Sequence, residues 1–368
     1  MENFQRCSRC VMDNKSDSTI TFDENGFCNY CTSQFKKIGK VYFPNEEGQA
    51  ILATLVTKIK NDGKGKKYDC LMGLSGGLDS SYLAYLGSKW GLRILAVHID
   101  DGFDTAISKE NIRKLVNACK IEMITVKPNS SQFYALTKAY FLAGVPNLAV
   151  PQDNILFANI YRIARKYGIK YFLSGGNFAL ESILQQGNTY NAYDIVNIFD
   201  IHKKFGNEKI NQLEFISTLR KTFYHNFGLV KTERPLNYID YNRDKAFKEL
   251  KEACGFEYYG SKHLENSLTA FIQLYWFPKK FNVDKRTSHL SSMIVSGQMD
   301  RETAISILDK PILSATEEES LVSLIKAKLN ISNSDFIKIM NSPNKQHNEY
   351  RTEKLMPILR KILRKKPY

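Results

Sequence analysis

The sequence predicts a doubly wound α/β protein with a mostly parallel sheet, preceded by a small cysteine-bound module and followed by a mainly helical region. Short apolar runs alternate with amphipathic segments between residues 68 and 205, which is typical of strands and helices in a parallel sheet. Two CxxC pairs lie near the N-terminus, and segments beyond about Asp200 follow helical spacing. The predicted parts are residues 1–45 for the cysteine module, 46–67 for a helix and linker, 68–205 for the sheet domain and 206–368 for the helical region.

The composition is that of a globular protein. Of the 368 residues, 43% are hydrophobic and 24% are charged, and no run approaches the roughly 18 apolar residues of a membrane span. The N-terminal MENFQRCSRC has no apolar signal region, so we expect a cytoplasmic location. The net charge of +14 indicates anionic partners, and nucleic acid, a nucleotide sugar and an anionic membrane surface all fit it.

The first forty residues carry a metal-binding pattern. The pairs Cys7–Cys10 and Cys28–Cys31 each have CxxC spacing, and seventeen residues separate them. This spacing is typical of a tetrahedral zinc site with four cysteine ligands. Because sulfur fills all four positions, the zinc would be structural, and it would supply much of the folding free energy of so small a module. An iron–sulfur cluster is the alternative, and disulfides are less expected in the cytoplasm.

The stretch that organises the chain follows a predicted helix over 49–60 and a polar linker over 61–67. Residues 68–74 are mostly apolar and short, as a buried strand should be. The next three residues, Ser75-Gly76-Gly77, cannot continue that strand. Helical spacing then begins at Leu78 and runs to Trp90. The sequence therefore predicts a strand, a glycine turn and a helix.

This turn is suited to bind phosphate. Glycines let backbone N–H groups approach a ligand, and the helix N-terminus adds donors and a partial positive charge. Ser75, Ser80 and Ser81 supply hydroxyl donors, and Asp79 can hold Mg²⁺ against a phosphate. The turn is not a Walker A loop, because no Lys follows the glycines.

The hexapeptide at residues 75–80, SGGLDS, resembles the SGGxDS pyrophosphate loop of the PP-loop ATP pyrophosphatases. Members of that superfamily cleave ATP between its α and β phosphates and adenylate a substrate oxygen. The alternative is an ordinary strand–turn–helix with a serine cap. The resemblance implies that Ser75, Gly76, Gly77, Asp79 and Ser80 contact the nucleotide.

Further strands and helices follow this unit. Ligands in doubly wound sheets bind at the carboxyl ends of strands, so the polar tips at 75–80, 98–102 and 174–177 should converge on one crevice. The predicted strands are 93–99, 121–126 and 170–174, and the predicted helices are 107–119, 131–142 and 153–167.

The PP-loop resemblance also implies roles for the second and third tips. Val97, His98 and Asp100 would border the nucleotide. A second glycine loop, Ser174-Gly175-Gly176, would lie near the α phosphate. A lone His at a strand end is more often a packed or capping residue than a catalyst, and no general-base role is assigned to His98.

The region after Asp200 is predicted to be mainly helical and contains two polar, aromatic stretches, at 234–240 and 278–292. The basic cluster at 350–368 is best explained as a solvated amphipathic helix. The predicted helices are 211–227, 242–253, 261–277, 300–308, 316–329 and 334–340.

Motifs from residue 5 to about 310 resemble those of bacterial N-acetyl sugar amidotransferases. The chain carries CSRCVMD from Cys7, ITFDENGFCNYC from Ile20 and LSGGN from Leu173, with Glu181 and Ser182 beyond. RPLNYIDYN at 234–242 and DKRTSHLSS at 284–292, with SGQ at 296–298, complete the set.

The family resemblance implies a reaction and a set of residues. ATP adenylates the amide oxygen of an acetamido group on a sugar, ammonia attacks the activated carbon, and AMP leaves with an acetamidino product. The products would serve surface polysaccharides such as lipopolysaccharide O-antigens, or flagellar nonulosonic acids. We expect ATP, Mg²⁺ and Zn²⁺ as cofactors. The expected catalytic residues are Asp79, Lys285 and Arg286, and the expected substrate-binding residues are Asn177, Glu181, Arg234, Lys262 and His289. For each of the cations a surface salt bridge is the alternative.

The ammonia source is expected on a separate protein. An N-terminal-nucleophile glutaminase needs Cys after the initiator Met, and residue 2 is Glu. Cys70, Cys119 and Cys254 do not lie in a nucleophile-elbow context either. The family implies a glutaminase partner, in a pair related to the two subunits of imidazole glycerol phosphate synthase.

Two alternatives stay open. A tRNA-modifying PP-loop enzyme, of the thiolation or lysidine type, fits the basic charge and the zinc ribbon. However, sulfur transfer usually calls for reactive cysteines beyond those of the ribbon. A non-catalytic module that binds nucleic acid is the third hypothesis, against which the intact SGGLDS argues. Nucleic acid and membrane are therefore not the expected partners.

Overall fold

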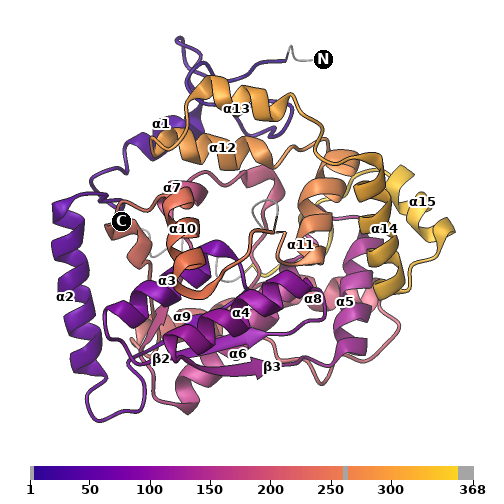
Figure 1. The fold of residues 1–368 in the computed structure, drawn as a ribbon. Coiled ribbons are helices and arrows are strands. Elements are labelled where there is room, and N and C mark those ends of the chain that lie inside the picture. Colours follow the sequence, from indigo (N-terminus) through magenta and orange to yellow (C-terminus); the bar gives the residue numbers. More distant parts are fainter. Residues whose placement is uncertain (1–3, 260–263, 355–368) are drawn as a thin grey trace.

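The computed structural model describes residues 4–259 and 264–354, and a five-stranded parallel sheet forms its centre (Figure 1). The strand order is β3-β2-β1-β4-β5, and each neighbouring pair is parallel. The order reverses beside β1, and such a switch point is where doubly wound sheets bind ligands. The strands are β1 (Cys70–Gly73), β2 (Ile94–Ile99), β3 (Glu122–Val126), β4 (Tyr171–Leu173) and β5 (Lys231–Glu233).

Helices cover both faces of the sheet, which explains why β1 and β2 are apolar on both sides. Cys70 and Met72 of β1 pack into the cluster that contains α3, α4 and α10, whereas Leu71 packs on the opposite side with α6 and α9. Alternate residues of one strand therefore enter different cores. The helices are α3 (Leu78–Lys89), α4 (Ala106–Cys119), α6 (Val150–Lys166), α9 (Thr218–Asn226) and α10 (Arg243–Cys254).

The sheet extends beyond residue 205, the boundary expected for the sheet domain. β5 pairs with β4 in register Tyr171 to Lys231, and α10 packs on α3 and α4, so the sheet unit extends into the part expected to be mainly helical. The sequence KTE of β5 is short and polar and has no strand signal of its own. Likewise, the helix expected over 211–227 is shorter, because α9 begins only after its cap Ser217.

A second, helical cluster lies beside the sheet (Figure 1), and the fully buried Trp276 is its largest side chain. It joins helices from the middle of the chain to helices from its end. Ile272–Phe281 is a π-helix with Pro278 inside it, where the sequence indicates an ordinary helix ending at 277. The other members are α5 (Ser130–Ala143), α8 (Ile195–Phe205), α11 (Ser267–Phe271), α14 (Ala315–Leu329) and α15 (Asn333–Asn341).

The N-terminal cysteine module packs on helices that come from far along the chain, seen at the top of Figure 1. The Arg301 guanidinium donates to the carbonyls of Cys7 and Cys10, at 2.9 to 3.2 Å. The Val11 N–H donates to Ser291 Oγ at 3.1 Å. The helices of this part are α1 (Asn29–Phe35), α7 (Phe178–Glu181), α12 (Arg286–Val295) and α13 (Arg301–Leu308). The helix α2 (Glu46–Asp62) lies apart from them and contacts the turn at Pro235–Tyr238.

The remaining elements are short 3₁₀ turns at Gln186–Asn188, Pro235–Tyr238 and His347–Glu349. Among the described helices, none combines the length and the apolar character that crossing a membrane requires.

Candidate active site

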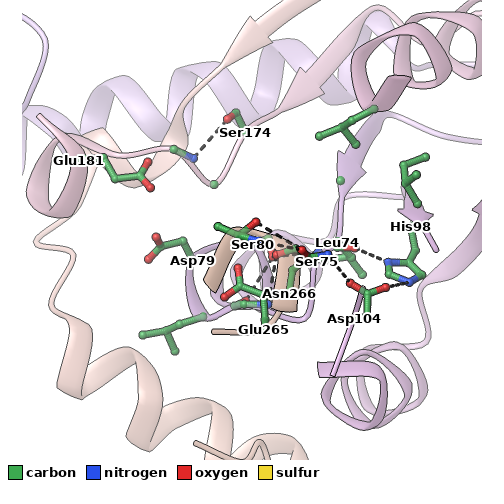
Figure 2. Close-up of a pocket in the computed structure, with 18 of the residues that line it drawn as sticks. Leu74, Ser75, Asp79, Ser80, His98, Asp104, Ser174, Glu181, Glu265 and Asn266 are labelled. Carbon is green, nitrogen blue, oxygen red and sulfur yellow. Dashed lines mark hydrogen bonds and ion pairs between the residues drawn. The ribbon is translucent and has the colours of Figure 1, made fainter. Parts of the chain in front are cut away.

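A cavity of about 580 Å³ opens at the carboxyl ends of the central strands (Figure 2). The loop after β1 and the loop after β4 form adjacent parts of its wall, which is the arrangement expected at the point where the strand order reverses. Its walls come from the two glycine loops, from the ends of β2 and α6, and from residues 243–269. The polar lining side chains are Ser75, Asp79, Ser80, His98, Asp101, Asp104, Gln152, Asp153, Ser174, Glu181, Arg243, Asp244, Tyr258, Tyr259, Glu265, Asn266 and Thr269.

The glycines of the two loops permit close backbone approaches. Gly76 has φ of +78°, and a Cβ there would lie 2.4 Å from the carbonyl oxygen of Ser108. A Cβ on Gly175 would lie 2.9 Å from the amide nitrogen of Ser80. The two loops therefore touch through backbone, and no larger residue fits at either position.

The first loop presents donors at the start of α3. Gly77 is the N-cap and supplies no side-chain cap, so the helix N-terminus faces the cavity without one. Ser75 Oγ accepts from the Gly77 N–H at 3.2 Å and lies 3.3 Å from Ser80 Oγ. The Leu78 N–H donates to Tyr259 Oη at 2.8 Å. Hydroxyls and helix-start amides of this kind suit a phosphate group.

Asp79 stands in the first turn of α3 and accepts a hydrogen bond from Tyr241 Oη. Burial, and then the Asp79 charge, raise the pKa of Tyr241 well above its usual range, so Tyr241 stays a donor at neutral pH. This bond holds the Asp79 carboxylate at the cavity wall. Oxygen ligands are what Mg²⁺ prefers, so the donor chemistry fits that ion, and Asp79 would be one of its ligands.

His98 and two aspartates form a buried group at the end of β2. His98 Nδ1 lies 2.8 Å from the carbonyl oxygen of Leu74, and Nε2 lies 3.2 Å from Asp104 Oδ2. Burial lowers the pKa of His98, but Asp104 and the Leu74 carbonyl outweigh it, and the net pKa is raised. Burial and the Asp104 charge raise the pKa of Asp101 to about 6. Figure 2 shows His98 and Asp104 on the opposite side of the cavity from Glu181.

The structure brings many of the predicted residues into one place. The predicted nucleotide and substrate residues that line the cavity are Ser75, Gly77, Asp79, Ser80, His98, Ser174, Gly175, Gly176 and Glu181. Arg234 lies beside the second glycine loop, with its Nε 3.9 Å from the place where a Cβ of Gly176 would stand. Gly76 supports the first loop from behind, against Ser108.

Other predicted residues lie behind the wall. Val97 is fully buried in the core under β2. Asp100 pairs with Lys109 at 3.1 Å and with Lys127 at 3.6 Å. Asn177 caps α7 through the Leu180 N–H at 2.9 Å. These three side chains are not part of the cavity lining, and their contact with a ligand stays a prediction.

The predicted catalytic cations are not at the cavity wall. Arg286 donates to Asp284 and to the carbonyls of Ile307, Leu308 and Lys310, which fixes the start of α12 to the end of α13. Arg286 thus has a structural engagement, and the catalytic role expected for it stays a prediction. His289 Nδ1 lies 3.0 Å from the Leu180 carbonyl oxygen, and Lys262 lies outside the described residues.

Lys285 differs from Arg286. Burial lowers its pKa to about 8, while the charges of Asp17 and of Glu181 raise it. Of these two carboxylates, Glu181 lines the cavity. Within residues 4–259 and 264–354, no hydrogen bond from the Lys285 ammonium group is found.

Sequence reasoning missed the wall contributed by Gln152, Asp153, Arg243, Glu265 and Asn266. For Gln152 and Asp153 a signal existed, because they lie in the first turn of α6, which starts at the carboxyl ends of the strands. The others come from the helical region, where only the folded chain shows which side chain returns to the sheet.

The four N-terminal cysteines form a closed, buried cluster. Sγ atoms are 3.7 Å apart for Cys7 and Cys31, 3.6 Å for Cys10 and Cys28, and 3.5 Å for Cys28 and Cys31. Zn–S bonds of about 2.3 Å in a tetrahedron place sulfurs about 3.8 Å apart. Backbone N–H groups of Arg9, Cys10 and Cys28 approach Cys7 Sγ at 3.2 to 3.4 Å, as a thiolate requires. The cluster is compatible with zinc.

Comparisons with known proteins give one family match. Residues 265–363 match the model of the LPS biosynthesis protein WbpG-like, C-terminal domain. A comparison with curated proteins finds no significant match. The matched region includes Glu265, Asn266 and Thr269 of the cavity wall.

Three solved structures are similar to the chain at low identity. An NMN synthetase from Francisella tularensis is 15% identical, with a TM-score of 0.32, and the match covers 78% of this chain and 95% of that one. An NH3-dependent NAD synthetase from Campylobacter jejuni is 17% identical, with a TM-score of 0.29 and coverage of 56% and 93%. An NAD+ synthetase from Burkholderia pseudomallei is 13% identical, with a TM-score of 0.34 and coverage of 81% and 95%. Similarity at this level does not identify a function.

Proposed function

We propose that the chain is an ATP-dependent amidotransferase that converts the N-acetyl group of a sugar or nucleotide sugar to an acetamidino group. One observation carries the proposal: the SGGLDS loop and the second glycine loop meet at one cavity. Another part of the wall of this cavity comes from the start of the WbpG-like region, residues 265–363. The name of that family places its members in lipopolysaccharide biosynthesis, which agrees with a sugar substrate.

The cavity supports adenylation of an amide oxygen. The amide oxygen attacks the α phosphorus and displaces pyrophosphate; ammonia then adds to the amide carbon, and the C–O bond breaks with AMP as leaving group. The helix-start amides and the serines of the first loop would bind the departing pyrophosphate. Mg²⁺ would neutralise phosphate charge beside Asp79. Lys285, acting through Glu181, is the cation we assign to the sugar side of the cavity.

The cavity charge supports a cation-bound nucleotide. Among the described lining residues, seven carry a carboxylate, whereas Arg243 is the only Lys or Arg. A bare triphosphate would be repelled at this wall, whereas a magnesium-bound one is not. We include in the proposal a structural zinc in the cysteine module and ammonia from a separate glutaminase.

The test supplies purified protein with ATP, Mg²⁺, ammonia and a panel of N-acetylated nucleotide sugars. We expect AMP release and a sugar product about one mass unit lighter, because NH replaces oxygen. AMP formed only when tRNA is added would overturn the proposal in favour of a tRNA-modifying enzyme, which the net charge of +14 would suit.

A further inference from the structure

His98 is held between two acceptors at the edge of the cavity (Figure 2). Its Nδ1 lies 2.8 Å from the Leu74 carbonyl oxygen, and its Nε2 lies 3.2 Å from Asp104 Oδ2. The Leu74 carbonyl only accepts, so Nδ1 donates to it, and the Asp104 carboxylate at ion-pair distance from Nε2 favours a second proton on the ring. Both side chains are buried, with 7% and 5% exposed.

The first of these bonds fixes the residue directly before the nucleotide loop. Leu74 is the last residue ahead of Ser75, and its N–H donates to the Val97 carbonyl at 2.9 Å. Its carbonyl is fixed by His98. Both backbone groups of Leu74 are therefore tied to β2, which sets the direction in which the loop leaves the sheet.

The second bond reaches a segment that pairs with the WbpG-like region. Asp104 and Asn266 form an antiparallel bridge, and the Thr105 N–H donates to the Glu265 carbonyl at 3.0 Å. The Glu265 carboxylate in turn lies against the loop, since a Cβ on Gly77 would be 2.6 Å from its Oε1. The contacts form a ring that runs from the loop through His98, Asp104 and Glu265 back to the loop.

We propose that His98 is a positioning residue, which through Asp104 holds the nucleotide loop in register with the wall contributed by the C-terminal region. The proposal rests on the proposed nucleotide site, and His98 contacts no reacting atom in it. Its function is to keep the loop preorganised, so that MgATP binding does not have to order it.

The charged groups around His98 determine how this clamp depends on pH. Asp104 faces Nε2 directly, and Asp100 on the same strand end adds negative charge, which Lys109 and Lys127 partly neutralise. Because the pKa of His98 is raised, both ring bonds persist below that pKa, and one is lost as the pH rises through it. MgATP affinity should therefore fall with rising pH in the native protein.

The test compares variants that keep one donor each. The amide nitrogen of His98→Asn can replace Nδ1 and still reach Leu74, whereas that of His98→Gln replaces Nε2 and reaches Asp104. Calorimetry with MgATP should give a Kd raised tenfold or more in both variants, because each breaks one of the two contacts that join the loop to the C-terminal wall. At saturating ATP, kcat should change less than threefold. His202→Gln is the matched control, because its ring also bonds one backbone carbonyl, that of Glu208 at 2.7 Å, on α8.

An unchanged Kd in His98→Gln would overturn the inference, as would a kcat loss above a hundredfold at unchanged KM, which indicates a catalytic group. Thermal melts establish that each variant folds. If His98→Gln does not fold, Asp104→Asn replaces it in the test. The same rise in Kd is expected, and an unchanged Kd would again overturn the inference. MgATP binding is measured without any sugar. A protein that binds MgATP but does not modify sugars would therefore refute the proposed reaction, and the role of His98 in MgATP binding could still be tested.

Discussion

At the scale of single residues, the cavity combines many carboxylates with few fixed cations. Asp79 is the carboxylate on the nucleotide loop itself, and Tyr241 holds it in place. Lys285 is partly buried near the charges of Asp17 and Glu181, whereas Arg286 beside it is engaged in structural bonds. The two neighbouring basic residues therefore differ in their surroundings: among the described residues, Arg286 has a carboxylate partner at bonding distance and Lys285 has none.

Asp79→Asn should abolish AMP formation, with a loss of at least about a hundredfold, because the neutral amide no longer holds a metal against the phosphates. The fold should persist, since the amide oxygen of the new side chain can still accept from Tyr241. AMP release and a thermal melt check both statements. Asp309→Asn, at the exposed end of α13, is the control expected to retain activity. Persistent turnover in Asp79→Asn would refute the metal role.

Lys285→Met and Lys280→Met should have opposite effects. Lys280 donates to the carbonyls of Ile339 and Ser342 at 2.6 and 2.9 Å, so its loss should lower the free energy of unfolding by about 1–3 kcal/mol and spare activity. Lys285 makes no such bonds to the described residues and its burial disfavours the charged form, so its removal should not lower the free energy of unfolding but should lower activity. Urea unfolding and AMP release distinguish the two outcomes, and equal stability losses would contradict this assignment.

The pH dependence of stability tests Lys285 separately. Its pKa is about 8 in the folded chain and has an ordinary value of 10.5. Between these values the unfolded chain binds more protons, so the free energy of unfolding should rise with pH across this window. In Lys285→Met this rise in the free energy of unfolding with pH should vanish. Urea titrations at several pH values measure it, and an identical slope in both proteins would rule it out.

At the scale of elements, the unit of β1, loop and α3 depends on backbone geometry. Gly76 and Gly65 have nearly the same φ, +78° and +79°, but they differ in surroundings. The Cβ position of Gly76 is occupied by the Ser108 backbone, whereas that of Gly65 has no atom within 4 Å. An alanine at Gly65 would therefore introduce backbone strain alone, whereas an alanine at Gly76 would add a steric clash with Ser108.

Gly76→Ala should destabilise the protein by more than Gly65→Ala, for which strain alone costs about 1 kcal/mol. It should also weaken MgATP binding, because the loop must move away from Ser108. Urea unfolding and calorimetry give the two quantities. Equal losses in both variants would show that Ser108 yields to the new methyl group.

At the scale of the whole molecule, the cysteine module joins distant parts of the chain. Arg301 of α13 binds the carbonyls of Cys7 and Cys10, and Ser291 of α12 binds Val11. The last of these contacts lies between residues 280 positions apart in sequence. Loss of the module should therefore loosen α12 and α13 as well as the N-terminus.

Metal analysis should find one zinc per chain, and a chelator or Cys10→Ser should lower the melting temperature. The cause is the buried thiolates, which repel one another without a cation. Cys119→Ser, a partly exposed cysteine outside the cluster, is the matched control and should keep the metal. A natively folded protein with four free thiols and no metal would overturn this expectation.

Much of the fold could be predicted, because local patterns specify it. The apolar run before Ser75, the glycine turn and the helix after it occur where the sequence indicates, as do β2, β3 and β4 within two residues. β5 could not be predicted, because a three-residue polar strand is stabilised by pairing with β4 and not by its own composition.

The nucleotide loop and the cysteine cluster follow from the sequence, because each depends on residues close together along the chain. Which distant side chains complete the cavity depends instead on how the chain packs. Glu265 and Asn266 reach it because residues 265–267 pair with 103–105, and Arg286 is kept from it by bonds to Asp284 and α13. Such placements arise from contacts between segments far apart in sequence, and no local pattern of residues encodes them.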